Sequence, residues 1–364
     1  MKILYVITGL GLGGAEKCVL SLAEAMCQRG HDVKIAYLTG KVVLKPKYTE
    51  IDLISLKPHS FRHIFCSFYK YLKLIESFRP DVVHSHMVHA NIFARIGRLF
   101  KPIPKLISTA HSSNEGGRFR MLAYRLTHNL SDITTNVSQQ AVLEFENRGA
   151  VPKHGMVVVY NGIDIEKFSV IKPFNKREYL ELLGLDTNKK VLLAVGRLEE
   201  PKDYPNLIQA LELIKRKEIY NWQMVIVGSG TLKNEIETLI QSLGLAQEIK
   251  LIGMRYDISE LMNIADIYVL SSKFEGLPTV LIEAMACEKF IVATDCGGIT
   301  EILGSTGILV PPQNYIYLAK AIERALNLSE QEVYENGKYA RNRVKKLFSS
   351  ESYIKNWLEL YEYK

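Results

Sequence analysis

The sequence predicts an α/β protein made of two doubly wound, mainly parallel sheets. Short apolar runs that favour strands alternate with longer helical stretches through both halves of the 364 residues, which is the pattern of this fold class. A strong turn signal, Asn161-Gly162, separates the halves, and a charged, weakly patterned stretch follows it over 165–188. No tandem repeat, low-complexity tract or coiled-coil heptad interrupts this pattern.

The expected strands follow one another in order along each half. In the first half they lie at 2–7, 33–38, 81–84, 105–109 and 157–160. In the second half they lie at 191–195, 223–227, 249–252, 267–270, 290–293 and 308–310. Helical stretches connect them, as parallel strands require.

These elements predict four segments. Residues 1–160 form a first Rossmann-like domain, 161–188 a crossover, and 189–345 a second Rossmann-like domain. The last segment, 346–364, holds a helix that begins at Ser350, because serine is a favoured first capping residue. Its apolar residues recur at helical spacing and are Ile354, Trp357, Leu358 and Tyr361.

Composition limits the class of protein. The five cysteines are an odd number without a Cys-x-x-Cys pair, which favours reduced thiols in the cytosol. No apolar run reaches the roughly 18 residues of a membrane span. The apolar start over 2–7 runs into a glycine-rich loop without a cleavage pattern, so we expect a strand there and no signal peptide.

The most informative segment runs from Phe274 to Glu283. It reads Phe-Glu-Gly-Leu-Pro-Thr-Val-Leu-Ile-Glu, follows the strand at 267–270 and leads into a helix over 280–287. Free backbone N–H groups at such a helix start bind phosphate. Glu275 and Glu283 flank the turn, so both can accept hydrogen bonds from the hydroxyl groups of a sugar nucleotide. The simpler interpretation is a glutamate that only complements the helix dipole, and it explains one of these two residues but not both.

A second segment supplies countercharge. The strand at 191–195 ends in Gly196-Arg197, and Lys202 follows five residues after the arginine. The guanidinium is a rigid fork suited to phosphate and the ammonium a mobile point charge. Both residues lie where open α/β sheets bind ligands, outside the carboxyl end of a strand. Taken alone, Lys202 reads more simply as a solvated loop charge.

The first glycine cluster permits a different enzyme class. Gly9, Gly11 and Gly14 spell Gly-x-Gly-x-x-Gly after a strand, which is the dinucleotide-binding fingerprint. That fingerprint also needs an acidic residue after the second strand, but 33–38 is followed by Thr-Gly-Lys. A nicotinamide-dependent oxidoreductase, an enzyme of a different class, therefore stays an alternative interpretation of this chain.

Taken in order, these motifs resemble glycosyltransferase family 4, whose members are retaining enzymes of the GT-B fold. The resemblance covers nearly the whole chain and includes the Asn161-Gly162-Ile163-Asp164 crossover and Cys296-Gly297-Gly298 followed by Glu301. It implies two Rossmann-like domains that face each other across a cleft. The first domain is then the acceptor side, the second binds the donor, and the C-terminal helix returns to the first.

The resemblance also implies a reaction. A hexose or N-acetylhexosamine moves from a nucleoside diphosphate sugar, here expected to be a UDP-sugar, to a glycan or polyprenyl-diphosphate-linked acceptor. The product belongs to surface polysaccharide such as O-antigen, capsule or lipopolysaccharide. We expect no cofactor, no metal and no nucleic acid partner. An inactive homologue that only binds sugar nucleotides is the third hypothesis, although the intact Arg197, Lys202, Glu275 and Glu283 set argues against it.

Each site residue takes a role from the resemblance. Glu275 holds hydroxyl groups of the sugar, Glu283 holds the ribose, and Arg197 and Lys202 stabilise the departing diphosphate. His111, at the end of the strand 105–109, contacts the donor sugar from the first domain. The remaining donor-binding residues are Gly13, Gly14, Gly228, Arg255, Gly276, Leu277, Pro278 and Thr279. Asp203, where the family often has glycine, is expected to point to solvent.

Three further histidines need separate treatment. His84, His86 and His89 have a spacing that occurs in zinc sites, but no cysteine or carboxylate lies alongside them. We therefore expect no metal there. An ordinary loop histidine is the simplest interpretation of the three, and a place for His86 on the acceptor side is the functional one.

The charge distribution predicts a membrane partner. Residues 1–160 hold 21 Lys and Arg against 11 Asp and Glu, a net charge of +10, while the remainder carries −3. Basic and apolar residues are mixed over 61–79, 92–101 and 118–125, a chemistry that favours anionic lipid. We expect a cytoplasmic protein that associates peripherally with the inner face of the membrane through 61–125. For any single helix, packing on the sheet is the simpler interpretation.

Overall fold

The computed structural model describes the chain except for residues 12, 58–63, 113–114 and 363–364. The chain folds into two compact units. Unit 1 comprises Met1–Gly162 together with Tyr353–Lys364, and unit 2 comprises Ile163–Ser352. The stretch 161–188 that we expected as a crossover therefore lies almost wholly in unit 2, where part of it forms helix α6 (Lys176–Leu182).

Unit 1 is built on a parallel sheet with the strand order β3-β2-β1-β4-β5-β6-β7. Its strands are β1 (Lys2–Ile7), β2 (Asp32–Tyr37), β3 (Asp52–Ser55), β4 (Val82–His86), β5 (Lys105–Thr109), β6 (Ile133–Asn136) and β7 (Val157–Val158). The order reverses between β1 and β4, which pair directly. Such a reversal opens a crevice at the carboxyl ends of the strands.

Helices cover both faces of this sheet. They are α1 (Gly14–Gln28), α2 (Ile64–Phe78), α3 (Val88–Gly97), α4 (Arg118–Thr127), α5 (Gln139–Asn147) and α14 (Ser350–Glu362), with a 3-10 turn at His128–Leu130. Successive strand residues point to opposite faces. Leu4 and Val6 therefore pack with α2 and α3, while Tyr5 and Ile7 pack with α1 and α14.

Unit 2 repeats this design with the strand order β10-β9-β8-β11-β12-β13. Its strands are β8 (Lys190–Val195), β9 (Trp222–Val227), β10 (Ile249–Leu251), β11 (Ile267–Leu270), β12 (Phe290–Thr294) and β13 (Ile308–Val310). All pairings are parallel, and the order reverses between β8 and β11. Unit 2 therefore has its own crevice at the carboxyl ends of these two strands.

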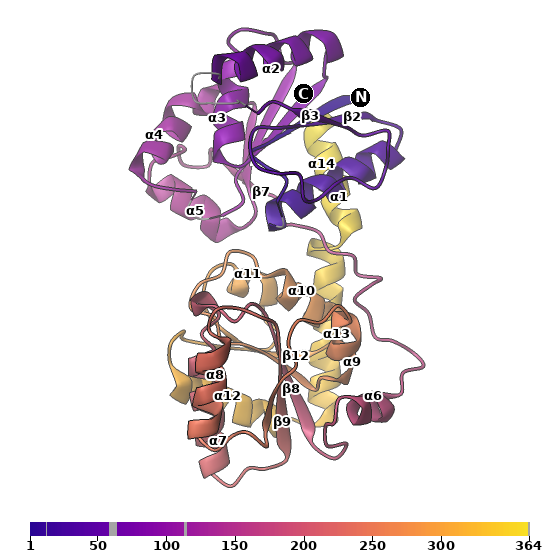
Figure 1. Cartoon of the computed structure of the whole chain (residues 1–364), viewed down its shortest axis with the longest axis vertical. Coiled ribbons are helices and arrows are strands. Elements are labelled where there is room, and N and C mark those ends of the chain that lie inside the picture. The colour runs from indigo at the N-terminus through magenta and orange to yellow at the C-terminus, as the bar shows by residue number, and fades with distance from the viewer. Residues whose placement is uncertain (12, 58–63, 113–114, 363–364) are drawn as a thin grey trace. The chain divides into compact units, whose positions relative to one another are not determined.

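The helices of unit 2 form two layers. Besides α6 they are α7 (Tyr204–Arg216), α8 (Lys233–Ser242), α9 (Ile258–Ile264), α10 (Thr279–Ala286), α11 (Ile299–Leu303), α12 (Tyr315–Leu326) and α13 (Glu330–Leu347), with a 3-10 turn at Glu200–Lys202. Helices α7, α8 and α12 build the larger apolar core against one face of the sheet. Helices α9, α10 and α13 contact strands from the other side (Figure 1).

The predicted strands agree with the observed ones to within two residues at each end, but two strands of unit 1 were missed. These are β3 and β6. The C-terminal helix is present, and its side chains Tyr353, Trp357 and Tyr361 enter the core of unit 1. Its capping residue is Ser349, whose Oγ accepts a hydrogen bond from the N–H of Ser352 at 3.1 Å. The predicted cap one residue later is therefore wrong.

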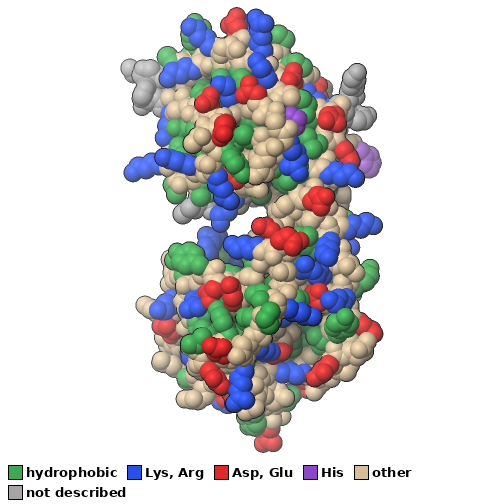
Figure 2. All heavy atoms as spheres, turned by 90° about the vertical axis from the view of Figure 1, so that its right-hand side faces the viewer, with side chains coloured by type: hydrophobic (Ala, Val, Ile, Leu, Met, Phe, Trp, Pro, Cys, Tyr) green, Lys and Arg blue, Asp and Glu red, His purple; other side chains and the backbone are tan. Residues whose placement is uncertain are grey.

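The surface and the helix lengths bear on the membrane hypothesis. None of the helices in the described part of the chain is long and apolar enough to cross a bilayer. The upper part of Figure 2 shows one face of unit 1, where basic side chains are interspersed with acidic and apolar ones. The positive net charge of this half is therefore not gathered into one patch on that face.

Candidate functional site

The centre of the candidate site lies where the strand order of unit 2 reverses. Gly196 and Arg197 follow β8, while Ser271, Ser272 and the loop to Glu275 follow β11. Because β8 and β11 are paired and parallel, their carboxyl ends meet at one edge of the sheet. Two segments that are far apart in the sequence thus meet at the position where sheets of this kind bind ligands.

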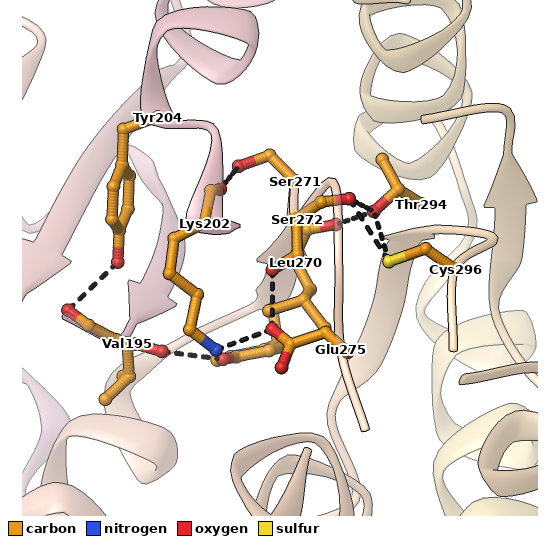
Figure 3. A network of polar contacts seen from close by, with 11 residues as sticks. Val195, Lys202, Tyr204, Leu270, Ser271, Ser272, Glu275, Thr294 and Cys296 are labelled. Carbon is orange, nitrogen blue, oxygen red and sulfur yellow. Dashed lines mark hydrogen bonds and ion pairs between the residues drawn. The ribbon is translucent and has the colours of Figure 1, made fainter. Parts of the chain in front are cut away.

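Two predicted residues form an ion pair at this edge. The Nζ atom of Lys202 lies 2.5 Å from Oε1 of Glu275, and the two side chains are only 18% and 11% exposed. Figure 3 shows the ammonium directed at the carboxylate. The hydroxyl of Ser272 donates to the same oxygen at 2.6 Å. Since an ammonium has three N–H donors, Lys202 can keep this contact and still donate to an anionic ligand.

Hydrogen bonds to the backbone fix the two loops that carry the pair. Ser271 donates from its hydroxyl to the carbonyl of Lys202 at 2.9 Å, and the N–H of Lys273 donates to the carbonyl of Pro201 at 2.8 Å. Thr294 donates to the carbonyl of Ser272 at 2.7 Å (Figure 3). The ion pair is therefore held in place before any ligand binds, as electrostatic stabilisation of a reaction requires.

Helix α10 begins beside this pair and confirms the predicted helix to within one residue. Pro278 occupies the capping position and forms no side-chain cap. The first backbone N–H groups of the helix, from Thr279 on, therefore donate no hydrogen bond to a capping side chain and carry partial positive charge. Glu283 lies in the second turn of α10 and is half-buried.

The turn before α10 packs tightly against the loop after β12. Gly297 has a positive φ of 62°, and a Cβ atom there would lie 1.9 Å from the carbonyl oxygen of Glu275. The N–H of Gly298 donates to the carbonyl of Gly276 at 2.9 Å. Gly276 and Leu277 are thus held in the turn by a backbone approach that only glycine at 297 permits.

Arg197 and Gly228 lie on the same edge of the sheet. The Arg197 side chain is exposed. Gly228 has a positive φ of 147°, and a Cβ atom there would lie 1.9 Å from the carbonyl oxygen of Gly196. Gly228 therefore lets the loops after β8 and β9 come together, which is a packing reason for glycine at this position.

Arg255 is already engaged by a neighbour. Its Nε and Nη2 atoms bind the Asp257 carboxylate at 2.8 and 2.5 Å, and Tyr179 of α6 donates a third hydrogen bond to that carboxylate. The hydrogen bonds from Arg255 lower the pKa of Asp257 to about 2. The arginine is thus fixed within unit 2, and its contact with the donor stays a prediction.

Asp203 does not point to solvent, so the expected exposure is wrong. The residue is 7% exposed and adopts left-handed backbone angles of φ 48° and ψ 47° at the start of α7. Burial raises the pKa of its carboxyl group. The left-handed conformation is one that glycine adopts without strain, which gives a physical reason for the glycine that the resembling family often has here.

In unit 1, the predicted glycines lie beside the reversal between β1 and β4. Helix α1 begins at Gly14, and Gly13 caps it with an extended backbone. A Cβ atom on Gly13 would lie 2.3 Å from Oε2 of Glu16. The glutamate therefore folds back over the helix start, where a carboxylate is stabilised by the helix dipole.

His86 and His111 are brought into direct contact in unit 1. His86 ends β4, His111 follows β5, and Nδ1 of His86 lies 3.0 Å from Nε2 of His111. Burial lowers the pKa of His111 to about 4, and burial together with the neighbouring histidines holds the pKa of His86 well below its usual value. Both rings are therefore neutral near pH 7. Since His86 is fully buried, contact with an acceptor stays a prediction.

His84 is part of the core of unit 1. Its Nδ1 and Nε2 atoms lie 2.7 Å from the hydroxyls of Tyr361 and Thr109, and its ring packs on Trp357. The hydroxyl of Tyr361 also contacts that of Tyr5 at 3.0 Å. Within the described residues, no group of three or more His, Cys, Asp and Glu side chains is placed to hold a metal ion.

A second set of residues, which we did not predict, surrounds His111. Oε1 of Glu115 accepts a hydrogen bond from the N–H of His111 at 2.8 Å, and the hydroxyl of Tyr124 donates to Oε2 at 2.6 Å. Asn91 donates to that hydroxyl at 2.8 Å. Burial raises the pKa of Glu115. An acidic residue four positions after His111, in a basic half of the chain, was the available signal.

Two family models, one for each half, together match most of the chain. The model described as Glycosyltransferase Family 4 matches residues 12–167, and the model described as Glycosyl transferases group 1 matches residues 175–343. The chain belongs to glycosyltransferase family 4. This membership decides between the two enzyme classes that the glycine-rich loop left open, in favour of the glycosyltransferase.

Relatives from bacteria agree with the assignment. A Campylobacter jejuni alpha-1,4-N-acetyl-D-galactosaminyltransferase, whose name includes a PP-undecaprenol glycan, is 26% identical, covering 90% of this chain and 89% of its own. An Escherichia coli enzyme named UDP-Gal:alpha-D-GlcNAc-diphosphoundecaprenol alpha-1,3-galactosyltransferase is 29% identical, covering 62% of this chain and 60% of its own.

A solved structure shows the fold. Anabaena HepE in complex with UDP superimposes with a TM-score of 0.86 and 21% identity, covering 99% of both chains. The two Rossmann-like units of this glycosyltransferase therefore form the GT-B fold, as the sequence predicted.

Proposed function

We propose that this glycosyltransferase moves a hexose or N-acetylhexosamine from a UDP-sugar to a lipid-linked glycan with retention of configuration. The observation that carries the proposal is the Lys202–Glu275 ion pair, which lies at the carboxyl ends of β8 and β11. There a carboxylate for sugar hydroxyls and a cation for phosphate are held side by side before the donor arrives.

Charge at the site fits the departure of a nucleoside diphosphate. When the bond between the anomeric carbon and the diphosphate oxygen breaks, negative charge develops on the diphosphate. Lys202, the exposed Arg197 and the uncapped start of α10 offer positive charge to it. We propose that these groups replace a divalent metal and that the reaction needs no cofactor.

The sugar is held from several directions in this proposal. Glu275 accepts hydrogen bonds from the sugar hydroxyls and Glu283 from the ribose, while His111 contacts the sugar from unit 1. The acceptor hydroxyl forms its bond to the anomeric carbon on the face that the diphosphate leaves. Its proton passes to an oxygen of the departing phosphate, so the chain needs no base of its own.

The choice of donor and acceptor rests on relatives. UDP is bound in the Anabaena structure, and UDP-Gal appears in the name of the Escherichia coli enzyme. Both bacterial relatives carry an undecaprenol-linked diphosphate glycan in their names. These names support an acceptor on a polyprenyl diphosphate and a product in surface polysaccharide, such as O-antigen, capsule or lipopolysaccharide.

Membrane docking of unit 1 is the second part of the proposal, and α4 is its best-supported element. Phe119, Leu122 and Leu126 are 89%, 51% and 75% exposed. The exposed Arg118 and Arg125 lie along one edge of this apolar stripe, and Arg125 also donates to the carbonyl of Gly149 at 3.2 Å. An apolar stripe flanked by arginines suits the surface of an anionic membrane. The protein would then be cytoplasmic and bound to the inner face.

The other two segments support docking less well. On α2, Tyr71, Ile75 and Phe78 are buried in the core, so this helix packs on the sheet. In the segment 92–101 the basic residue Arg95 is fully buried and donates to Ser108 and Thr134. Residues 61–63, which begin the first segment, lie outside the described residues.

A donor screen tests the enzymatic proposal. UDP- and GDP-sugars are offered to the protein, and hydrolysis or transfer is followed by release of the nucleoside diphosphate. We expect turnover with one or a few UDP-sugars and an α-configured product from an α-configured donor. Binding without any turnover would favour the inactive homologue, and an inverted product would exclude retention.

Co-sedimentation with vesicles tests the docking proposal. We expect binding to anionic but not neutral vesicles, weakened by salt, and lost in Leu126→Asp. Leu182→Asp is the matched control, because Leu182 is 78% exposed and lies on α6 of unit 2. Equal binding of the two variants would exclude α4 as the docking element.

A further inference from the structure

Two neutral imidazole rings in hydrogen-bond contact must share a single proton. His86 and His111 are in this situation, with 3.0 Å between Nδ1 and Nε2. Either His86 donates from Nδ1 or His111 donates from Nε2. Each neutral ring carries one N–H. The two arrangements therefore differ in which outer nitrogen is protonated, Nδ1 of His111 in the first or Nε2 of His86 in the second.

The outer nitrogen of His86 distinguishes the two arrangements. Nε2 of His86 is buried and has no hydrogen-bond partner among the described residues. If His111 were the donor, His86 would carry its own proton on Nε2 as a buried, unpaired N–H group. Buried N–H groups without an acceptor are rarer than buried acceptors without a donor. The favoured arrangement therefore has His86 donating from Nδ1, which leaves the proton of His111 on Nδ1.

The ring of His86 is held firmly enough to impose this choice. It packs against the rings of His84 and Tyr5, with centroids 4.0 and 6.0 Å away. His84 is itself fixed by hydrogen bonds on both nitrogens, one of them to Tyr361 of α14. On the other side, Glu115 binds the backbone N–H of His111. Both partners of the His86–His111 bond are therefore anchored by separate parts of unit 1.

We infer that His86 is a positioning residue, which orients His111 and fixes it as the tautomer that donates from Nδ1. This inference rests on the proposed function, in which His111 contacts the donor sugar. His111 then acts toward the sugar as a hydrogen-bond donor and not as a base. The fully buried His86 reaches the reaction only through His111, which replaces the acceptor-side role that the sequence suggested for it.

Nitrogen-15 NMR of the histidine-labelled full-length protein measures the tautomer directly. The signals of His111 are identified by their loss in His111→Ala. In the wild-type protein we expect a protonated Nδ1 and an unprotonated Nε2 on His111. In His86→Phe, which keeps a ring but removes the donor, we expect the two tautomers to mix. His86→Asn places an amide N–H close to the position of Nδ1 and should restore the preference.

Kinetics with the donor found in the screen complete the test. We expect kcat to fall about 10- to 100-fold in His86→Phe while the donor KM changes less than about threefold, because a misplaced contact acts mainly in the transition state. His86→Asn should recover most of this loss. Tyr71→Phe is the control, since Tyr71 is buried in the same unit on the opposite face of the sheet, and should alter neither kcat nor the His111 signals.

Each outcome decides a separate point. A proton on Nε2 of His111 in the wild-type protein overturns the inference, even if His86→Phe fails to fold. An altered tautomer with unchanged kcat overturns the role in the reaction. Absence of turnover with every sugar nucleotide in the wild-type protein counts against the proposed function, whereas the NMR result does not depend on activity.

Discussion

Replacement of Glu275 by glutamine separates the two roles that its carboxylate has in the structure. Oε1 accepts hydrogen bonds from the Lys202 ammonium at 2.5 Å and from the Ser272 hydroxyl at 2.6 Å. Glutamine keeps the shape and an oxygen that accepts from Ser272. It removes the charge that holds the ammonium and the anionic acceptor for sugar hydroxyls.

The two effects have different magnitudes. A hydrogen bond to a charged group stabilises a protein by about 1.5–3 kcal/mol and a neutral one by about 0.5–1.5 kcal/mol. The substitution should therefore lower the free energy of unfolding by roughly 1–1.5 kcal/mol, or Tm by about 2–6 °C for a unit of this size. Loss of one pre-aligned contact in the transition state costs about 3–4 kcal/mol, which lowers kcat/KM by at least roughly 100-fold.

The assay compares this variant with a matched one. Glu248 is also 11% exposed and pairs with Lys215 at 2.8 Å, but it precedes β10 and so lies at the opposite end of the sheet. Glu248→Gln should lower Tm by a similar amount and leave kcat/KM unchanged. Thermal unfolding and donor turnover are measured on both variants.

One result would refute the reasoning. If Glu275→Gln loses stability as Glu248→Gln does but keeps wild-type kcat/KM, the Lys202–Glu275 pair only holds two loops together. A loss of Tm above about 10 °C would also contradict the magnitude, because the pair would then contribute far more than a part-exposed ion pair does.

Four further predictions concern the same molecule. Arg197→Ala should lower kcat/KM at least about 100-fold without changing Tm, because the side chain is exposed; unchanged turnover would remove it from the site. Glu283→Ala should weaken binding of UDP in calorimetry more than it lowers kcat. Donor cleavage should persist in EDTA, and rescue of a lost activity by Mg²⁺ or Mn²⁺ would contradict metal independence. The half-buried His111 has a pKa of about 4 when folded and about 6.5 when unfolded, so its contribution to stability should be complete above pH 6.5. Unfolding experiments should show up to about 3 kcal/mol of stability lost as pH falls from 6.5 to 4, and less in His111→Phe.

The strands that the sequence failed to predict share a physical reason. All six strands of unit 2 are short apolar runs, and their pattern identifies them. In unit 1, β6 has the sequence Ile-Thr-Thr-Asn and buries its polar residues, because Thr134 bonds the buried Arg95 and Thr135 contacts Thr109. Strand β3 lies at the edge of the sheet and has only two apolar residues, Leu53 and Ile54, between Asp52 and Ser55. Neither strand has the apolar run by which a buried strand is recognised.

The candidate site shows a similar limit. The sequence identified Lys202 and Glu275 because charged residues after strand ends stand out against apolar neighbours. It did not identify Ser272 or Glu115, whose importance depends on which side chains the fold brings beside them. The burial of charged residues could not be predicted either. In the sequence Asp203 and Arg95 look like ordinary surface charges, and only tertiary packing buries them.

The return of α14 to unit 1 has a consequence for synthesis on the ribosome. Tyr5, in β1, has the hydroxyl of Tyr361 in α14 as its hydrogen-bond partner. After the strands of unit 1 have left the ribosome, about 200 further residues must be translated, which takes roughly 10–40 s. During that time the face of the sheet that Trp357 and Tyr361 will cover stays open. The nascent chain must therefore fold unit 1 around a missing helix until α14 has been translated.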